Sequence, residues 1–230
     1  DIEENDQSLT YSASSRDERL VLVSTETLGD GGTGTLTLDV QDDRNGSAEV
    51  TVTVSDSQGR TLDSETFTLT VTAVNDSPIL TEIGDQVTNE DEDFSIVITG
   101  TDVDVETDGQ SLVFSAVSND ESLVMVSTTS GDSTGSGVLT FDVQDNQNGV
   151  VSIAVTIIDS DGGSASEVFE LTVSPVNDAP ILTEIGDQVT NEDEDFSIEI
   201  TGTDVDVETN GQSLVFSAVS NDESLVMVST

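Results

Sequence analysis

The sequence repeats itself with a shift of 102 residues, and this repeat limits what the chain can fold into more than any other feature. Residues 76–128 align with residues 178–230, and of the 53 aligned positions only three differ: Ser77/Ala179, Val97/Glu199 and Asp108/Asn210. Residues 1–75 align more loosely with residues 104–177. A period near 100 residues is too long for a solenoid and is typical of an array of small domains. The sequence therefore predicts the C-terminal part of one repeat at 1–75, a complete repeat at 76–177 and the N-terminal part of another at 178–230, as in a piece of a longer array.

Apolar residues alternate with polar ones through most of the complete repeat, which indicates half-buried β-strands. Together with short apolar runs, the alternation predicts about seven strands, around residues 79–83, 94–98, 112–116, 124–127, 139–143, 150–158 and 169–173. No convincing helical period is present. Seven short strands in about 100 residues favour an all-β fold made of tandem immunoglobulin-like β-sandwiches. A β-barrel is the weaker alternative.

The charge of the chain is extreme, because 48 Asp and Glu residues stand against 4 Lys and Arg residues, for a formal net charge of −44. High net charge can indicate disorder. However, Leu, Ile, Val and Phe together make up 66 of the 230 residues, about 29%, above the roughly 20% expected of a disordered chain. The sequence therefore predicts a folded protein with an excess of carboxylates that something must neutralise.

The missing residue types exclude several classes of function. Phosphate recognition needs clusters of Lys and Arg, and the only four cations are arginines, at positions 16, 19, 44 and 60, so neither nucleic acid nor an anionic membrane is expected as a partner. Without His, Cys or Lys, the chain has no residues for Cys/His zinc sites, cysteine nucleophiles, histidine triads or lysine Schiff bases. We therefore do not expect an enzyme.

The acidic residues gather at particular places in each repeat. Glu90 to Asp93 precede one predicted strand, Asp102, Asp104, Glu106 and Asp108 follow it at every second residue, and Asp159 and Asp161 end the long strand 150–158. Carboxylates that converge at strand ends repel one another unless a cation lies among them. Oxygen ligands without His or Cys favour Ca²⁺.

These motifs resemble those of cadherin-like repeats, especially the bacterial immunoglobulin-like tandem repeats with a VNDAP junction that occur in large surface adhesins. The resemblance rests on VNDSP and VNDAP at 74–78 and 176–180, on the acid that leads a strand, on the paired DxD and on the DSDGG segment at 159–163. It implies calcium bound between consecutive domains, with a first junction formed by Asn75, Asp76, Glu90, Asp102, Asp104 and Asp159 and joined by Asp161. It also implies a second junction formed by Asn177, Asp178, Glu192, Asp204 and Asp206.

The function implied by this resemblance is that of a secreted or cell-surface extender, in which calcium stiffens contacts between neighbouring repeats of a large adhesin that acts in cell adhesion or biofilm. Three alternatives stay open. The carboxylates could be only a solvated surface, the chain could be a subunit of a self-assembling extracellular filament made of identical chains, or it could be a module that binds glycan or protein. An EF-hand is disfavoured, because Val113 falls where the bidentate Glu should be.

Overall fold

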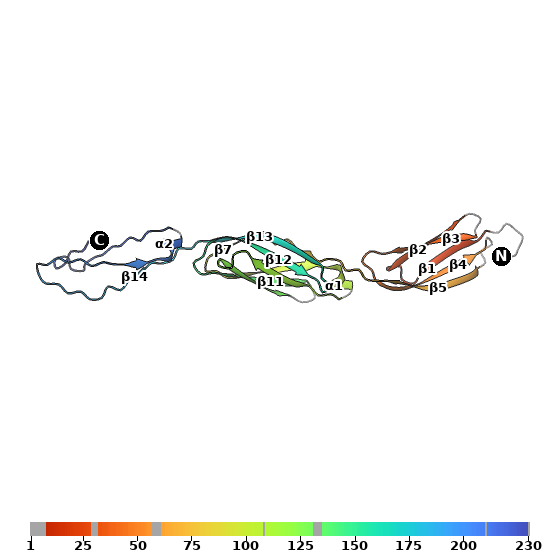
Figure 1. Ribbon diagram of the computed structural model, residues 1–230, viewed down its shortest axis with the longest axis horizontal. Coiled ribbons are helices and arrows are strands. Elements are labelled where there is room, and N and C mark those ends of the chain that lie inside the picture. The colour runs from red at the N-terminus through yellow and green to blue at the C-terminus, as the bar shows by residue number, and fades with distance from the viewer. Residues whose placement is uncertain are drawn as a thin grey trace.

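The computed structural model describes residues 8–28, 32–56, 61–107, 109–130, 135–209 and 211–229. Three β units follow one another in an elongated row, joined by the extended linkers 72–78 and 175–180 (Figure 1). We call them the first unit, the middle unit and the last unit.

The middle unit is a β-sandwich of two four-stranded sheets, with strand orders β10-β11-β8-β6 and β7-β13-β12-β9. Its elements are β6 (Ile79–Leu80), β7 (Gln86–Asn89), β8 (Phe94–Thr101), α1 (Val103–Thr107), β9 (Val113–Ser118), β10 (Val124–Ser130), β11 (Ser136–Val143), β12 (Gly149–Ile158) and β13 (Ser164–Ser174). All seven predicted strands are present, and the predicted all-β sandwich is confirmed. One strand, β7, was not expected.

The core of this sandwich comes from the alternating residues that the sequence pattern identifies. Along β11, every second side chain is buried, and β12 buries Val151, Ile153, Val155 and Ile157. Phe141 lies between the sheets, stacked on Phe94 at 4.3 Å and edge-on to Phe169 at 6.3 Å between ring centroids. Burial of these apolar side chains is the main force that holds the two sheets together.

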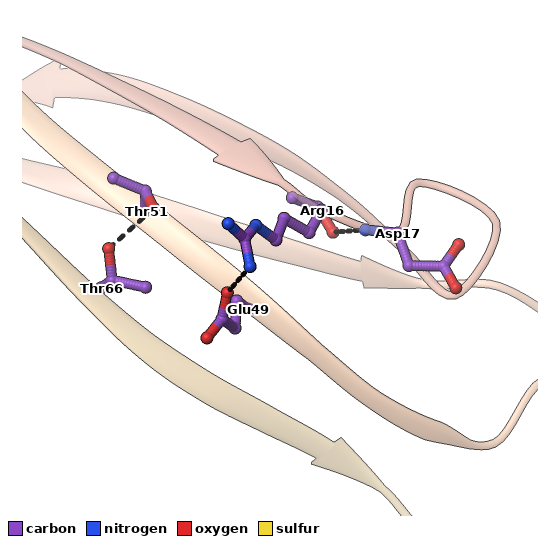
Figure 2. Close-up of polar contacts among 6 residues, drawn as sticks. Arg16, Asp17, Glu49, Thr51 and Thr66 are labelled. Atoms are coloured by element: carbon purple, nitrogen blue, oxygen red, sulfur yellow. Dashed lines mark hydrogen bonds and ion pairs between the residues drawn. The ribbon is translucent and has the colours of Figure 1, made fainter.

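The first unit has the same kind of sheets on a smaller scale. Its strands are β1 (Thr10–Ser15), β2 (Val21–Leu28), β3 (Thr33–Val40), β4 (Gly46–Ser55) and β5 (Thr61–Val71). They form the sheets β1-β4-β5 and β2-β3 over a core of Leu20, Val21, Ala48 and Val50. On the solvent face, Arg16 forms an ion pair with Glu49, and Thr51 and Thr66 share a hydrogen bond of 2.8 Å across neighbouring strands (Figure 2).

In the described part of the last unit, only β14 (Ile181–Leu182), β15 (Gly202–Thr203) and α2 (Val205–Thr209) are regular elements. Counterparts of β11, β12 and β13 are not among its residues, so its backbone has few neighbours with which to form a sheet. Apolar side chains that would face a core are therefore exposed, among them Phe196 at 53%. Neither this helix nor α1 is long and apolar enough to cross a membrane, and the same holds throughout the described residues.

Candidate metal centres at the two ends of the middle unit

A group of acidic residues lies at the end of the middle unit that faces the first unit. We call it the first-end cluster: Asn75 and Asp76 from the linker, Asp102 and Asp104 at the start of α1, and Asp159 and Asp161 from the turn after β12. The strand pairing explains the convergence, because β6 follows the linker and pairs with the last residues of β8, through Ile79 and Thr101. The carboxylates at 102, 104 and 159 belong to residues that are only 8%, 5% and 5% exposed, so three acids are buried side by side with the linker.

The short helix α1 fixes the first two of these acids. Asp102 acts as the N-cap of this helix, since its Oδ1 accepts a 2.8 Å hydrogen bond from the backbone N–H of Asp104. Asp104 Oδ2 in turn accepts a 2.8 Å bond from the backbone N–H of Asp76. A chain of carboxylates therefore connects the helix to the linker. Of the same acidic run, Asp108 and the side chain of Glu106 lie outside the described residues.

The turn after β12 fixes the other two. Asp159 Oδ1 accepts bonds from the backbone N–H groups of Asp161 and Gly163, at 2.8 and 2.9 Å, and its Oδ2 accepts a 3.1 Å bond from the side-chain amide of Asn75. A Cβ at position 163 would collide with the Asp159 carboxylate and lie 2.9 Å from Asn75 Nδ2, so these side chains would have to move to admit a larger residue there. The turn and the linker are thus in close contact.

The carboxyl groups of Asp102 and Asp159 in this cluster have pKa values shifted in opposite directions. Burial raises the pKa of Asp102, and the charges of Asp104, Asp159 and Asp76 raise it further, against one lowering hydrogen bond from the Asp104 backbone. For Asp159, burial alone would raise the pKa, but bonds from Asn75 and from the turn backbone outweigh it and lower the pKa. Asp102 Oδ2 is buried and has no hydrogen-bond partner. An unpaired buried carboxylate oxygen is costly, so this position favours a positive partner.

A second group of acids lies at the opposite end of the middle unit. We call it the second-end cluster: Glu90, Asp91, Asn177, Asp178, Asp204 and Asp206. The linker and α2 repeat the geometry of the first end, since Asp206 Oδ2 accepts a 2.8 Å bond from the backbone N–H of Asp178 and Asp204 Oδ1 accepts a 2.9 Å bond from that of Asp206. Burial raises the pKa of Asp178, and the nearby charges of Asp91, Asp206, Glu90 and Asp204 add to the effect. Asp178 Oδ2 is also buried without a partner.

The placement of Glu90 corrects a prediction. Glu90 was expected at the first junction, but its carboxylate accepts bonds from the backbone N–H of Val176 at 2.7 Å and from Asn148 Nδ2 at 3.0 Å, both at the second end. The cause is the unexpected strand β7, which runs parallel to β13 and pairs Asn89 with Ser174. The chain therefore leaves β7 where β13 also ends. Glu192, the counterpart of Glu90 in the last unit, is exposed, and the structure does not bring it to Asp178.

Sequence reasoning also missed residues that belong with these clusters. Asp91 has a left-handed backbone with φ of 64°, and its Oδ1 accepts a 2.8 Å bond from the backbone N–H of Asn146, which has φ of 57°. Gln110 donates from its side-chain amide to Asn75 and Asp161. The acidic run 90–93 was a signal for Asp91. The recurrence of Gln110 as Gln212 one period later was a signal for the glutamine.

The donor set of both clusters suits a hard cation. All candidate ligands are carboxylate or amide oxygens, and Ca²⁺ takes 6–8 oxygen ligands at about 2.3–2.6 Å. Within the described ranges, no group of three or more acidic side chains is already arranged around a common metal position. The carboxylates therefore converge but do not form a finished cage. The orphaned oxygens of Asp102 and Asp178 are the observation that fits a cation at each end.

Comparison with known proteins agrees with this architecture. Residues 75–172 match the family model described as bacterial Ig domain, whereas no curated protein matches the chain. The crystal structure of human CDH23 EC21-23 has 16% sequence identity and a TM-score of 0.52, over 87% of this chain and 69% of that one. The structure titled PcdhgB3 EC1-4 in 50 mM HEPES has 18% identity and a TM-score of 0.46, over 86% and 50%.

Surface-layer structures are also similar at a lower level. Domains 4 and 5 of the S-layer protein SbsC have 16% identity and a TM-score of 0.36, over 71% of this chain and 70% of that one. The chain spans only 21% of the longer structure of SbsC domains 1-6. The family match confirms the expected resemblance to bacterial immunoglobulin-like repeats, and the likeness to CDH23 EC21-23 concerns the fold alone. The family match lies on the middle repeat, at residues 75–172.

Proposed function

We propose that the chain is a non-catalytic segment of an extracellular surface protein, in which calcium ions bound at the ends of each repeat stiffen the linkers between repeats. In this proposal the segment covers one complete repeat, 76–177, between the C-terminal part of one repeat at 1–75 and the N-terminal part of another at 178–230, and acts as an extender that carries an adhesive region away from the cell. The observation that carries the proposal is that each cluster contains a buried carboxylate oxygen without a hydrogen-bond partner, Asp102 Oδ2 at the first end and Asp178 Oδ2 at the second.

We assign the candidate ligands from the geometry of the two clusters, and not from the two junction sets that the sequence resemblance implied. At the first end, Asp76, Asp102, Asp104 and Asp159 would hold a cation, with Asn75 and Asp161 beside them. At the second end, Asp178, Asp204 and Asp206 would do so together with Glu90 and Asp91, which the middle unit supplies. Glu90 is only 2% exposed and is therefore already fixed in position.

Stiffening follows from where these ligands come from. Asn75 and Asp76 belong to the linker, whereas Asp102, Asp104 and Asp159 belong to the body of the middle unit. A cation bound to both sets would remove conformational freedom from the linker, at a cost of roughly 1–2 kcal/mol per residue that the ion–carboxylate attraction must exceed. It would also relieve the repulsion among the acids, so folding and binding would be linked.

Calcium titration by calorimetry tests this proposal on the whole chain. Extracellular calcium modules bind with dissociation constants of order 10⁻⁴–10⁻³ M, and we expect affinities in that range. Replacing Asp102→Ala together with Asp104→Ala should weaken binding at the first end by at least about tenfold, because two charged ligands are lost.

A matched control removes two acids from elsewhere in the same unit. Glu82 and Glu170 are both exposed, and their replacement by Ala changes the net charge of the chain equally. The control should bind calcium as the wild type does. Equal weakening in both double variants would mean that bulk charge attracts the ion, and absence of calcium binding in the wild type would overturn the proposal.

A further inference from the structure

Gln110 connects three separate parts of the first end through a single side-chain amide. It follows α1 in the chain and precedes β9. Its Nε2 donates one hydrogen bond of 2.8 Å to Asn75 Oδ1, in the linker, and another of 3.2 Å to Asp161 Oδ2, in the turn after β12. These partners are 35 and 51 positions away in the sequence. The linker is therefore tied to the body of the middle unit by a group that is not a carboxylate.

The amide of Gln110 does at this contact what a cation would do among the carboxylates in the proposed function. Two oxygens, Asn75 Oδ1 and Asp161 Oδ2, converge on one point, and converging oxygens need a positive or donating partner. The amide nitrogen of glutamine carries two N–H donors, so it can serve both oxygens without charge. The two acceptors also decide which way the amide is turned, with its nitrogen toward them.

The opposite atom of the same amide is left without a partner. Gln110 Oε1 is buried and makes no hydrogen bond. Leaving a buried acceptor unpaired destabilises the folded state, and the two bonds donated by Nε2 must offset that loss. An aliphatic side chain at this position would avoid the unpaired acceptor. We therefore attribute the contact to the two N–H donors of the Gln110 amide.

The same contact recurs one repeat later. Gln212 Nε2 donates a 2.9 Å hydrogen bond to Asn177 Oδ1, again over 35 positions. Asn177 is the linker residue at the second end, as Asn75 is at the first. The glutamine contact therefore belongs to the junction and is not an accident of one loop.

We propose that Gln110 is a neutral latch, whose amide takes the place that a further cation would otherwise occupy between Asn75 and Asp161. The latch holds the linker to the middle unit when no calcium is bound, and it confines calcium to the carboxylates at 76, 102, 104 and 159. The second part rests on the proposed function, whereas the first part does not need calcium at all. The latch and the calcium site can therefore fail separately.

The first experiment measures the latch in the presence of a chelator. Gln110→Met keeps the length of the side chain but removes its donors, and amide hydrogen exchange reports on linker order. We expect exchange at Asp76 to become about fivefold faster, which corresponds to the loss of roughly 1 kcal/mol. Gln86→Met is the control, because Gln86 also donates to two oxygens, the carbonyls of Ile83 and Gly84, but belongs to β7. Unchanged protection of Asp76 in Gln110→Met would overturn the latch.

The second experiment measures how many calcium ions bind. Gln110→Glu removes the donors and places a carboxylate beside Asp161, so the chain should take up an additional ion and should melt at a lower temperature than the wild type in chelator. The same number of bound ions in Gln110→Glu as in the wild type would overturn the confinement of calcium by Gln110. A third outcome separates the two ideas: the wild type binds no calcium, but Gln110→Met still loses the protection of Asp76 from exchange. That result would overturn the proposed function and leave the latch standing.

Discussion

At the scale of single residues, Asp102 bears most directly on whether a cation binds at the first end. It caps α1 through one carboxylate oxygen and leaves the other buried and unpaired. These two facts oppose each other, because the cap stabilises the charged form whereas burial and the acids around it destabilise that form. A bound cation, as in the proposed function, would resolve the conflict. Without one, the folded state carries a charge that it would hold more easily as a neutral acid.

The raised pKa of Asp102 gives a pH dependence of defined sign. Because the folded state binds the proton more tightly than the unfolded state, the carboxyl group favours folding most below the ordinary value of 3.8. That contribution is lost as the pH rises from 3.8 through the raised pKa. In chelator, Asp102→Asn should therefore be more stable than the wild type near pH 7, and its melting temperature should fall less between pH 4 and pH 7.

Asp120→Asn provides the control for this pH series. Hydrogen bonds from Ser122 lower the pKa of Asp120, so its charged form supports folding above 3.8 and this support is lost as the pH falls. Asp120→Asn should not gain stability near pH 7. Parallel melting curves for the wild type and Asp102→Asn across this range would contradict the electrostatic role of Asp102.

At the scale of elements, the turn after β12 shows how closely the linker is packed. Gly163→Ala adds one methyl group that would collide with the Asp159 carboxylate and crowd Asn75 and Ser77. Overpacking of this kind costs about 1–3 kcal/mol, and for a domain of this size each kcal/mol lowers the melting temperature by about 4–8 °C. Thermal melting, with and without calcium, checks this expectation.

The matched control is Gly186→Ala in the last unit, where an added Cβ would meet no atom within 4 Å. We expect it to leave the melting curve unchanged. Calcium affinity should also fall in Gly163→Ala, since the methyl group displaces a candidate ligand. Wild-type stability and affinity in Gly163→Ala would show that the turn can move away and that the linker is not fixed by it.

The positions of the strands and helices also show how much of the fold could be predicted from the sequence. Alternation of apolar residues was enough to predict seven strands, because each buries a face that the period of 2 identifies. It could not predict β7, whose four residues Gln86–Asn89 carry a single apolar side chain, or α1, whose alternating acids look like a strand. The end at which Glu90 lies depends on β7 pairing in parallel with β13, a contact between residues about 85 positions apart that no local pattern encodes.

At the scale of the whole molecule, the chain combines a charge of −44 with an elongated row of units (Figure 1), so we expect its shape to depend on bound cations. α1 and α2 each begin beside a linker and follow an acid that caps the helix, so the same ligand geometry occurs at two places one period apart. In the proposed function, repetition of one junction would give both linkers the same kind of response to a cation. The shape of the array should therefore depend on calcium as a unit, while each sandwich keeps its own core.

Small-angle X-ray scattering of the whole chain during a calcium titration tests this account most directly. With chelator, mutual repulsion and free linkers should give a broad range of conformations. With saturating calcium, the radius of gyration should settle at the value of a straight, narrow rod, and Asp102→Ala with Asp104→Ala should reduce the change, whereas Glu82→Ala with Glu170→Ala should not. Scattering curves that superimpose with and without calcium would contradict the claim that cations at the ends of the repeats set the shape of the chain.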